Sequence, residues 1–239
     1  MKTRLIRLLL LAMLYAGASQ ASAGLLVDRA IVMFDPSGER REDVVVINDD
    51  PDSRLFVSVE AYEVQRAGTP DERLVPQAKD RAPAFIATPN RLVVPPGGRS
   101  IVRLIQVADV VEEERVYRIN FRPVERPPEV PAEAGDPSVS SLLDVVIAYQ
   151  VLAIVQPPAA RALPEAVRTG RLATFQNRGT SNYLLTRGRQ CHPGAPEDCR
   201  ELPSRRIYPG NRWDVQLPFD GPFNYTVRTP SGYSVSRFD

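Results

Sequence analysis

The sequence is poor in the side chains on which most catalytic and metal sites depend. It has one histidine, His192, and two cysteines, Cys191 and Cys199. A Ser-His-Asp or Cys-His arrangement is therefore not expected, and a structural zinc site, which needs four ligands, lacks enough donors. The glycines fit neither the phosphate-loop nor the dinucleotide-binding spacing. We predict that the chain is not an enzyme and takes no metal and no cofactor.

Lysine is almost absent as well. Lys2 and Lys79 are the two in the chain, so arginine carries nearly all the positive charge. The formal net charge is +1, and a chain so close to neutral creates no field that gathers nucleic acid. The acidic run Glu112-Glu113-Glu114 is expected to be a solvated turn rather than a general acid and base. We expect neither nucleic acid nor a small-molecule substrate as a partner.

No apolar run is long enough to be kept as a membrane span. A basic start is followed by an apolar stretch from Leu8 to about Gly17 and by the small residues Ala21-Ser22-Ala23, which is the pattern of a secretory signal peptide. The apolar stretch has roughly 10 residues, against the ~20 that cross a bilayer. We predict that residues 1–23 are removed and that the mature chain, from Gly24, works outside the cytoplasm.

Helical periodicity is missing throughout, and the 23 prolines oppose long helices. Apolar and polar residues alternate instead, with turn chemistry between the runs, which predicts strands with one wet face. We therefore predict an all-β chain of two sandwich domains. The expected strands are 25–34, 43–48, 54–64, 91–94, 100–107, 115–122, 142–155, 171–176, 182–186, 205–208, 213–217, 223–229 and 233–238.

A proline-stiffened connector that begins at Gln156-Pro157 divides the chain. We place an N-terminal domain at 24–156 and a smaller C-terminal sandwich at 157–239. Cys191 and Cys199 enclose a Pro/Gly turn, and in an exported chain such a pair predicts a disulfide that closes a hairpin loop. A second proline-rich stretch, 123–137, is expected to be a long mobile loop.

The longest predicted strand, 142–155, follows that loop. One face of it is entirely apolar or aromatic, and this face consists of Leu143, Val145, Ile147, Tyr149, Val151 and Ala153. The pattern suits a central strand that is buried on both faces. It suits equally an exposed edge that pairs with a partner by β-augmentation, in which main-chain bonds give affinity and alternate side chains give specificity. An apolar edge of this kind needs a partner to cover it.

Several short motifs, in their order and spacing, resemble the periplasmic chaperones of the chaperone–usher pilus pathway. The motifs are Phe34-Asp35-Pro36, Ile47-Asn48-Asp49-Asp50, Ala87-Thr88-Pro89, Pro95-Pro96-Gly97-Gly98-Arg99 and Val116-Tyr117-Arg118-Ile119-Asn120-Phe121. The second domain, with its two cysteines, Arg206-Ile207-Tyr208-Pro209-Gly210 and Trp213, is similar to the alternative branch that serves common-pilus and colonisation-factor fimbriae.

The resemblance implies two immunoglobulin-like domains in a boomerang arrangement. It also implies that pilus subunits bind along the last strand of the first domain, by donor-strand complementation, before delivery to an outer-membrane usher. Counted without gaps back from Pro157, the donor positions fall on Leu143, Val145 and Ile147, and Tyr149 and Val151 continue the same face. A fimbrial structural subunit or a two-domain adhesin is the alternative to a chaperone.

The chain departs from the family at the charged anchor. Classical members hold the terminal carboxylate of the subunit with an arginine and a lysine, and in the same ungapped count those positions are Ile31 and Leu152. Arg29, two residues from the expected place, is a candidate carboxylate anchor because an arginine forks well onto a carboxylate. Gln156 likewise stands where classical members have an arginine that ties the two domains.

Overall fold

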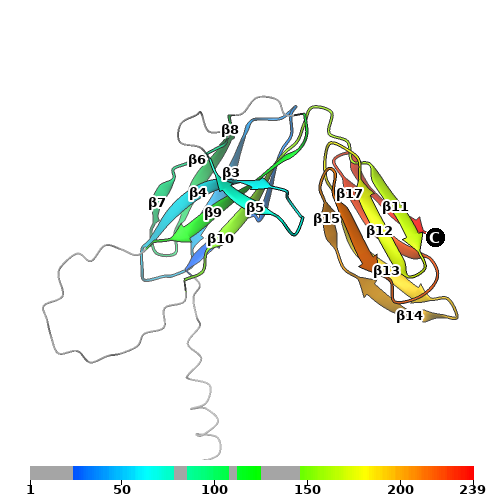
Figure 1. Ribbon diagram of the computed structural model, residues 1–239. Helices are drawn as coiled ribbons and strands as arrows, with labels where there is room; N and C mark the ends of the chain where they lie inside the picture. The colour runs from blue at the N-terminus through cyan, green and yellow to red at the C-terminus, as the bar shows by residue number, and fades with distance from the viewer. Residues whose placement is uncertain (1–23, 78–84, 108–111, 125–145) are drawn as a thin grey trace, which may run out of the picture.

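The computed structural model describes residues 24–77, 85–107, 112–124 and 146–239. The predicted signal peptide, residues 125–137 of the proline-rich loop, and Leu143 and Val145 lie outside these ranges. Within them the regular structure consists entirely of β-strands, and the described residues contain no helix able to cross a bilayer. The strands form two lobes that meet at an angle (Figure 1), and the predicted all-β, two-domain fold is confirmed.

The first lobe, domain 1, is a sandwich of two sheets. In one sheet the order is β1 (Leu25–Val27), β3 (Arg41–Asn48), β8 (Arg99–Gln106) and β6 (Phe85–Thr88). In the other it is β2 (Ile31–Phe34), β10 (Tyr149–Val155), β9 (Arg115–Pro123), β4 (Leu55–Gln65) and β5 (Arg73–Pro76), with β7 (Arg91–Val94) also paired to β4.

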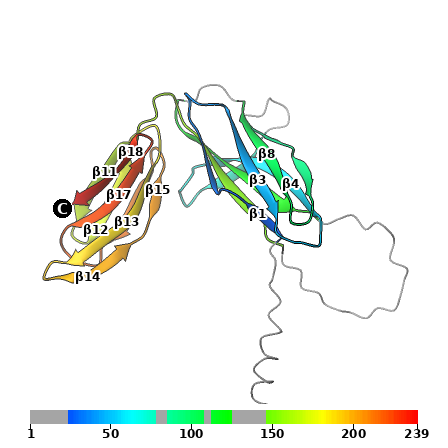
Figure 2. The same ribbon diagram turned by 180° about the vertical axis from the view of Figure 1, so that it is seen from behind.

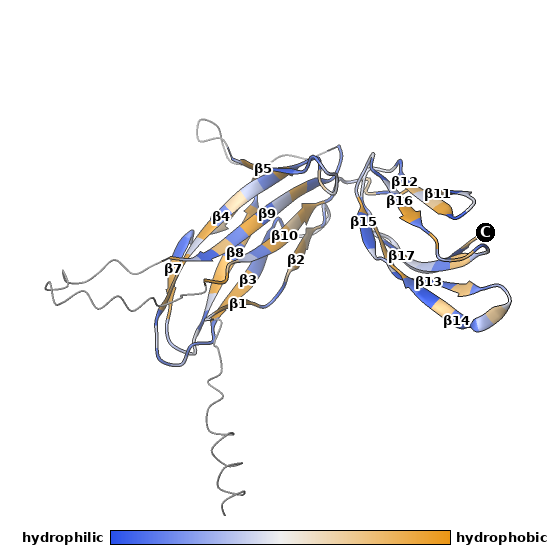
Figure 3. Cartoon of the chain, turned by 60° about the horizontal axis from the view of Figure 1, so that its bottom comes forward, coloured by the Kyte–Doolittle hydropathy of each residue, from blue (hydrophilic) through white to orange (hydrophobic). Residues whose placement is uncertain are grey.

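Alternation along these strands places the apolar residues between the two sheets of domain 1, and Figure 3 shows the changing hydropathy along β3, β4 and β8. The aromatic centre of this core is the ring of Phe85. It lies edge-on to Phe34, with ring centroids 5.1 Å apart, and stacks on Tyr117 at 5.2 Å. All three side chains are buried. These residues hold β2, β6 and β9 together, and β10 lies between β2 and β9.

The second lobe, domain 2, is a smaller sandwich. One sheet has the order β11 (Pro164–Thr169), β12 (Leu172–Asn177) and β16 (Arg212–Gln216). The other has the order β14 (Ala195–Leu202), β13 (Tyr183–His192), β17 (Phe223–Thr229) and β18 (Gly232–Phe238), with β15 (Arg205–Ile207) paired to β13. The buried residues of the two domains form two separate clusters, and the domain boundary at Gln156-Pro157 stays a prediction.

The predicted disulfide is confirmed. Cys191 and Cys199 are bonded and lie directly opposite each other on β13 and β14, with Cα atoms 3.9 Å apart. The cysteines therefore join two paired strands as well as the loop between them.

We expect replacement of both cysteines by serine to lower the free energy of unfolding of domain 2 by about 2–3 kcal/mol, because the open chain regains the entropy that the closed loop had removed. Urea denaturation followed through Trp213 measures this loss. The wild type treated with reductant is the matched control and should lose a similar amount. An unchanged denaturation midpoint in both samples contradicts the prediction.

Within the acidic run before β9, Glu112 and Glu113 are exposed in a bend, as expected of a solvated turn. Glu114 instead contributes to the contact between the domains, which corrects the interpretation for this residue. Glu114 donates its N–H to the carbonyl of Thr180 (3.0 Å), and its Oε2 accepts hydrogen bonds from Ser181 Oγ (2.7 Å) and from Asn182 N and Nδ2 (3.0 and 2.6 Å). A carboxylate that accepts three hydrogen bonds is firmly placed, so Glu114 links domain 1 to the start of β13.

A second contact between the domains comes from the turn between β4 and β5, which points toward domain 2 in Figure 1. The carbonyl of Gly68 accepts a hydrogen bond from Arg205 Nη2 (2.8 Å), and that of Ala67 accepts one from Asn211 Nδ2 (2.7 Å). Gly68 has φ +73°, and a Cβ placed on it would lie 2.8 Å from the ring of Tyr208. Only glycine fits both the backbone conformation and this approach.

Candidate functional site

The first half of β10 has an open edge. On that side, β2 pairs in parallel with Leu152–Val155 and with no earlier residue of β10. The N-terminal segment explains this gap, because it crosses from one sheet to the other. It first pairs with β3 as β1, crosses over at residues 28–30, and pairs with β10 as β2 only from Ile31. Within the described residues, 146–151 therefore has no strand beside it on the side away from β9. We call residues 146–151 the open edge.

The predicted strand 142–155 is shorter than expected over its described part, because the ladder to β9 begins at Tyr149, which faces Phe121. Continued by two residues, this register would place Ile147 opposite Pro123. The N–H of Val124 donates to the carbonyl of Phe56 in β4, so the alternate residue, Pro123, faces β10. Proline has no N–H to donate, and residues 146–148 are left without regular pairing.

The five predicted donor residues have different surroundings. Ile147 is 40% exposed and Tyr149 is half-buried against the core of domain 1. Val151 has no exposed surface and belongs to that core. Because its side chain already fills the sandwich of its own chain, we remove Val151 from the donor set. Leu143 and Val145 lie outside the described residues, and their role stays a prediction.

One cross-strand row on the outer face of this sheet contains both anchor positions. Leu152 of β10 is paired with Ile31 of β2 on one side and with Arg118 of β9 on the other, and Arg118 is in turn paired with Tyr62 of β4. The two anchor positions, where this chain has isoleucine and leucine, are therefore neighbours in space. Ile31 is 46% exposed and Leu152 is half-buried. The cation of this row is Arg118.

Among the described residues, the carboxylate that pairs with Arg118 is that of Glu72, with Nη2 3.1 Å from Oε1. Both side chains are about two-thirds shielded from solvent, at 33% and 28% exposure, so the pair is screened less than a surface pair. The pattern of alternation placed Arg118 on the wet face but gave no sign that it lies beside Leu152. That relation needs the register of three strands, which no local signal carries.

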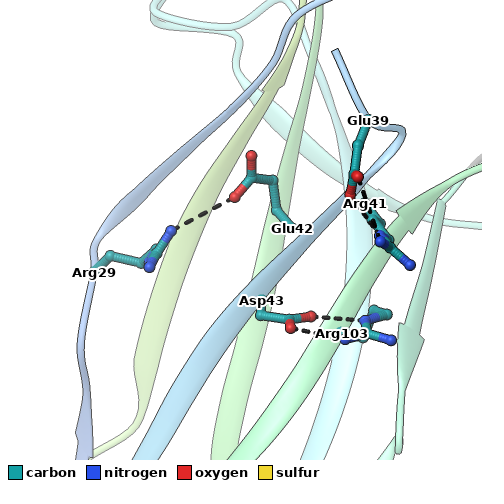
Figure 4. Close-up of a pocket in the computed structure, with 6 residues that line it drawn as sticks. All are labelled: Arg29, Glu39, Arg41, Glu42, Asp43 and Arg103. Atoms are coloured by element: carbon teal, nitrogen blue, oxygen red, sulfur yellow. Dashed lines mark hydrogen bonds and ion pairs between the residues drawn. The ribbon is translucent and has the colours of Figure 1, made fainter.

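Arg29, the candidate carboxylate anchor, points to the other sheet. Its Nε lies 3.1 Å from Asp28 Oδ2 and its Nη1 lies 3.5 Å from Glu42 Oε2 on β3. Figure 4 shows it in a pocket where Arg103 and Asp43 also pair, at 2.8 Å. Hydrogen bonding to Arg103 lowers the pKa of the Asp43 carboxyl.

The lining residues of this pocket are Arg29, Glu39, Arg41, Glu42, Asp43 and Arg103. Three arginines and three carboxylates leave no net positive charge to hold an anion, so we do not carry Arg29 forward as an anchor. Among the described residues, no group of three or more His, Cys, Asp or Glu side chains has the arrangement of a metal site.

Known proteins share this architecture. No protein-family model matches the chain. In sequence it is similar to a CS1 fimbrial subunit of Escherichia coli, with 25% identity over 170 residues, which cover 70% of each chain.

In structure it is similar to the class 5 fimbriae chaperone CfaA, with a TM-score of 0.63 and 17% identity over 90% of this chain and 99% of that one. It is also similar to a chain of the complex between the Salmonella enterica SafA pilin and the SafB chaperone, with a TM-score of 0.61 and 14% identity over 90% and 95% of the two chains. This chain therefore has the two-domain all-β fold of the fimbriae chaperone CfaA.

Proposed function

We propose that this chain is a periplasmic chaperone of the alternative branch, which binds pilus subunits by donor-strand complementation and delivers them to an outer-membrane usher. The observation that carries the proposal is the open edge, where unpaired main chain lies beside the exposed side chain of Ile147. The proposal is supported by the fold that this chain shares with CfaA and with a chain from the complex of the SafA pilin and the SafB chaperone. The role is non-enzymatic and needs no nucleotide.

In this mechanism a strand from the pilus subunit adds to the open edge by β-augmentation. The side chains of Leu143, Val145 and Ile147 fill the subunit core, and Tyr149 lies at the border between that core and domain 1. From Leu152 onward β2 occupies the same edge of β10. A subunit strand therefore stops at Ile31, and this steric stop fixes the register that classical relatives set with a charged pair.

The alternative is a structural subunit or an adhesin, and the CS1 relative is named as a fimbrial subunit. Against it, the strand at the predicted mature N-terminus is already paired, with Leu25 opposite Asn48 of β3, and is not a free donor extension. Co-expression with a pilus subunit from the same gene cluster separates the two functions. A chaperone gives a soluble one-to-one complex and is missing from finished fibres, whereas presence of this chain in the fibres refutes the proposal.

We further propose that Arg118 receives the terminal carboxylate of the subunit. Neighbouring strands lie ~4.8 Å apart, so a chain end that stops beside Leu152 lies within two strand spacings of β9. Arg118→Ala should weaken the binding of subunits about 10- to 100-fold, because a charge-assisted hydrogen bond contributes roughly 1.5–3 kcal/mol. Titration calorimetry with a pilus subunit held soluble by a replaceable peptide measures the change.

Arg122→Ala is the matched control and should bind normally. Arg122 lies on the same face of β9 as Arg118, two residues beyond Asn120. Adding two residues to the C-terminus of the subunit moves its carboxylate, and should weaken binding to the wild type but not to Arg118→Ala. Equal losses for both arginine variants contradict the anchor role. If both arginine variants bind as the wild type does, Arg118 is not the anchor, and the open edge remains the proposed binding site.

A further inference from the structure

The edge strands of domain 2 differ in how they are protected against pairing with another chain. Strands that border a sheet usually carry charges or proline, which discourage such pairing. Four of the five border strands of domain 2 follow this rule, since each has at least two residues that are charged or proline: β11, β14, β15 and β16.

The fifth border strand, β18, lacks this protection. Its sequence is Gly-Tyr-Ser-Val-Ser-Arg-Phe, with Arg237 as the one charge. Tyr233 is 78% exposed and Val235 is 74% exposed, the highest values among the large hydrophobic side chains of the described residues. In an antiparallel ladder alternate residues direct their backbone groups away from the neighbouring strand, and on β18 these groups meet no further strand in the described structure.

The position of β18 leaves this edge accessible. It lies on the flank of domain 2 that faces away from domain 1, as both opposite views show (Figures 1 and 2). The open edge of β10 belongs to the other domain, so a partner on β18 does not compete with a pilus subunit for the same strand.

We propose that β18 pairs in antiparallel fashion with the β18 of a second copy of this chain, about a two-fold axis at Val235. The sequence is self-complementary in this register. Val235 faces Val235, Ser234 faces Ser236, and Tyr233 faces Arg237, so the one cation meets an aromatic ring rather than its own copy. The interface is isologous and closes at two chains, and it joins two five-stranded sheets into one continuous sheet.

Cross-linking tests the register. Residues directly opposite in an antiparallel pair have Cβ atoms about 4.5–5.5 Å apart, so Val235→Cys places two thiols in reach across the axis. The two native cysteines are already joined to each other and do not compete. With a mild oxidant the mature variant should form a disulfide-linked dimer that reductant reverses. Val167→Cys on β11, where Val167 is 65% exposed, is the control and should stay monomeric.

Sedimentation equilibrium of the free chain, without any pilus subunit, tests the association itself. The wild type should show a concentration-dependent dimer. Val235→Lys should raise its dissociation constant by about 10-fold or more, because like charges then lie opposite each other, while Val167→Lys should not. A wild type that stays monomeric at its highest soluble concentration, or Val235→Cys that cross-links no better than the control, overturns the proposal.

Discussion

Ile147→Asp should abolish the complex with a pilus subunit while leaving the chaperone folded. The side chain is 40% exposed and lies outside the ladder to β9, so the free protein loses little when it changes. In the proposed complex the same position enters the apolar core of the subunit, where an unpaired carboxylate costs several kcal/mol. Co-purification of a tagged subunit, with the circular dichroism of the free variant, measures both properties.

Two control variants separate the effect of position from the effect of charge. Ile101→Asp adds the same charge at an exposed site on β8, in the other sheet of domain 1, and should bind normally. Val146→Asp changes the adjacent residue, which alternation places on the opposite face, and should bind better than Ile147→Asp. If Ile147→Asp is folded and co-purifies as the wild type does, Ile147 is not a donor residue.

Phe175→Ala should unfold domain 2 at moderate temperature. The ring is completely buried and has four aromatic neighbours, Trp213, Phe223, Tyr225 and Phe238, at centroid distances from 5.3 to 6.2 Å. Removing a buried phenylalanine side chain costs about 3–5 kcal/mol, a large part of the ~5–15 kcal/mol that stabilises a typical domain.

Scanning calorimetry should therefore show the transition of domain 2 shifted well below that of the wild type. Phe219→Ala is the control, because Phe219 is half-buried and its ring contact is with His192, and it should shift the transition much less. A Phe175→Ala protein with the thermal profile of the wild type would mean that this cluster does not hold domain 2 together.

Alternation in the sequence predicted most of the strands that have one buried face, although it missed the short β6 and the second half of β13. The runs 54–64 and 115–122 agree closely with β4 (Leu55–Gln65) and β9 (Arg115–Pro123). The strands β11 and β14 were not predicted, since both are largely exposed and carry the charges and prolines of border strands. Periodicity reports which residues are buried, and a strand held by main-chain pairing alone leaves little trace of it.

The same limit applies to the candidate site. Periodicity put Ile147 and Val151 on one apolar face, but it does not say whether that face packs into this chain or into a partner. In the structure Ile147 is exposed, whereas Val151 belongs to the core of domain 1. Glu114 was misread because Ser181, one of its partners, lies 67 residues away. Features that depend on contacts between distant strands have no local signal.

Glu72 couples the outer face of domain 1 to the contact between the two domains. Its Oε1 accepts a hydrogen bond from Arg118, its Oε2 accepts one from the N–H of Gly68 (2.7 Å), and the carbonyl of Gly68 accepts one from Arg205 of domain 2. One carboxylate thus connects the outer face of β9 to the neighbouring domain. A ligand that draws Arg118 away from Glu72 alters the restraint on this turn, and by reciprocity a change in the angle between the domains alters the affinity for that ligand. The affinity for such a ligand is therefore expected to depend on the angle between the two domains.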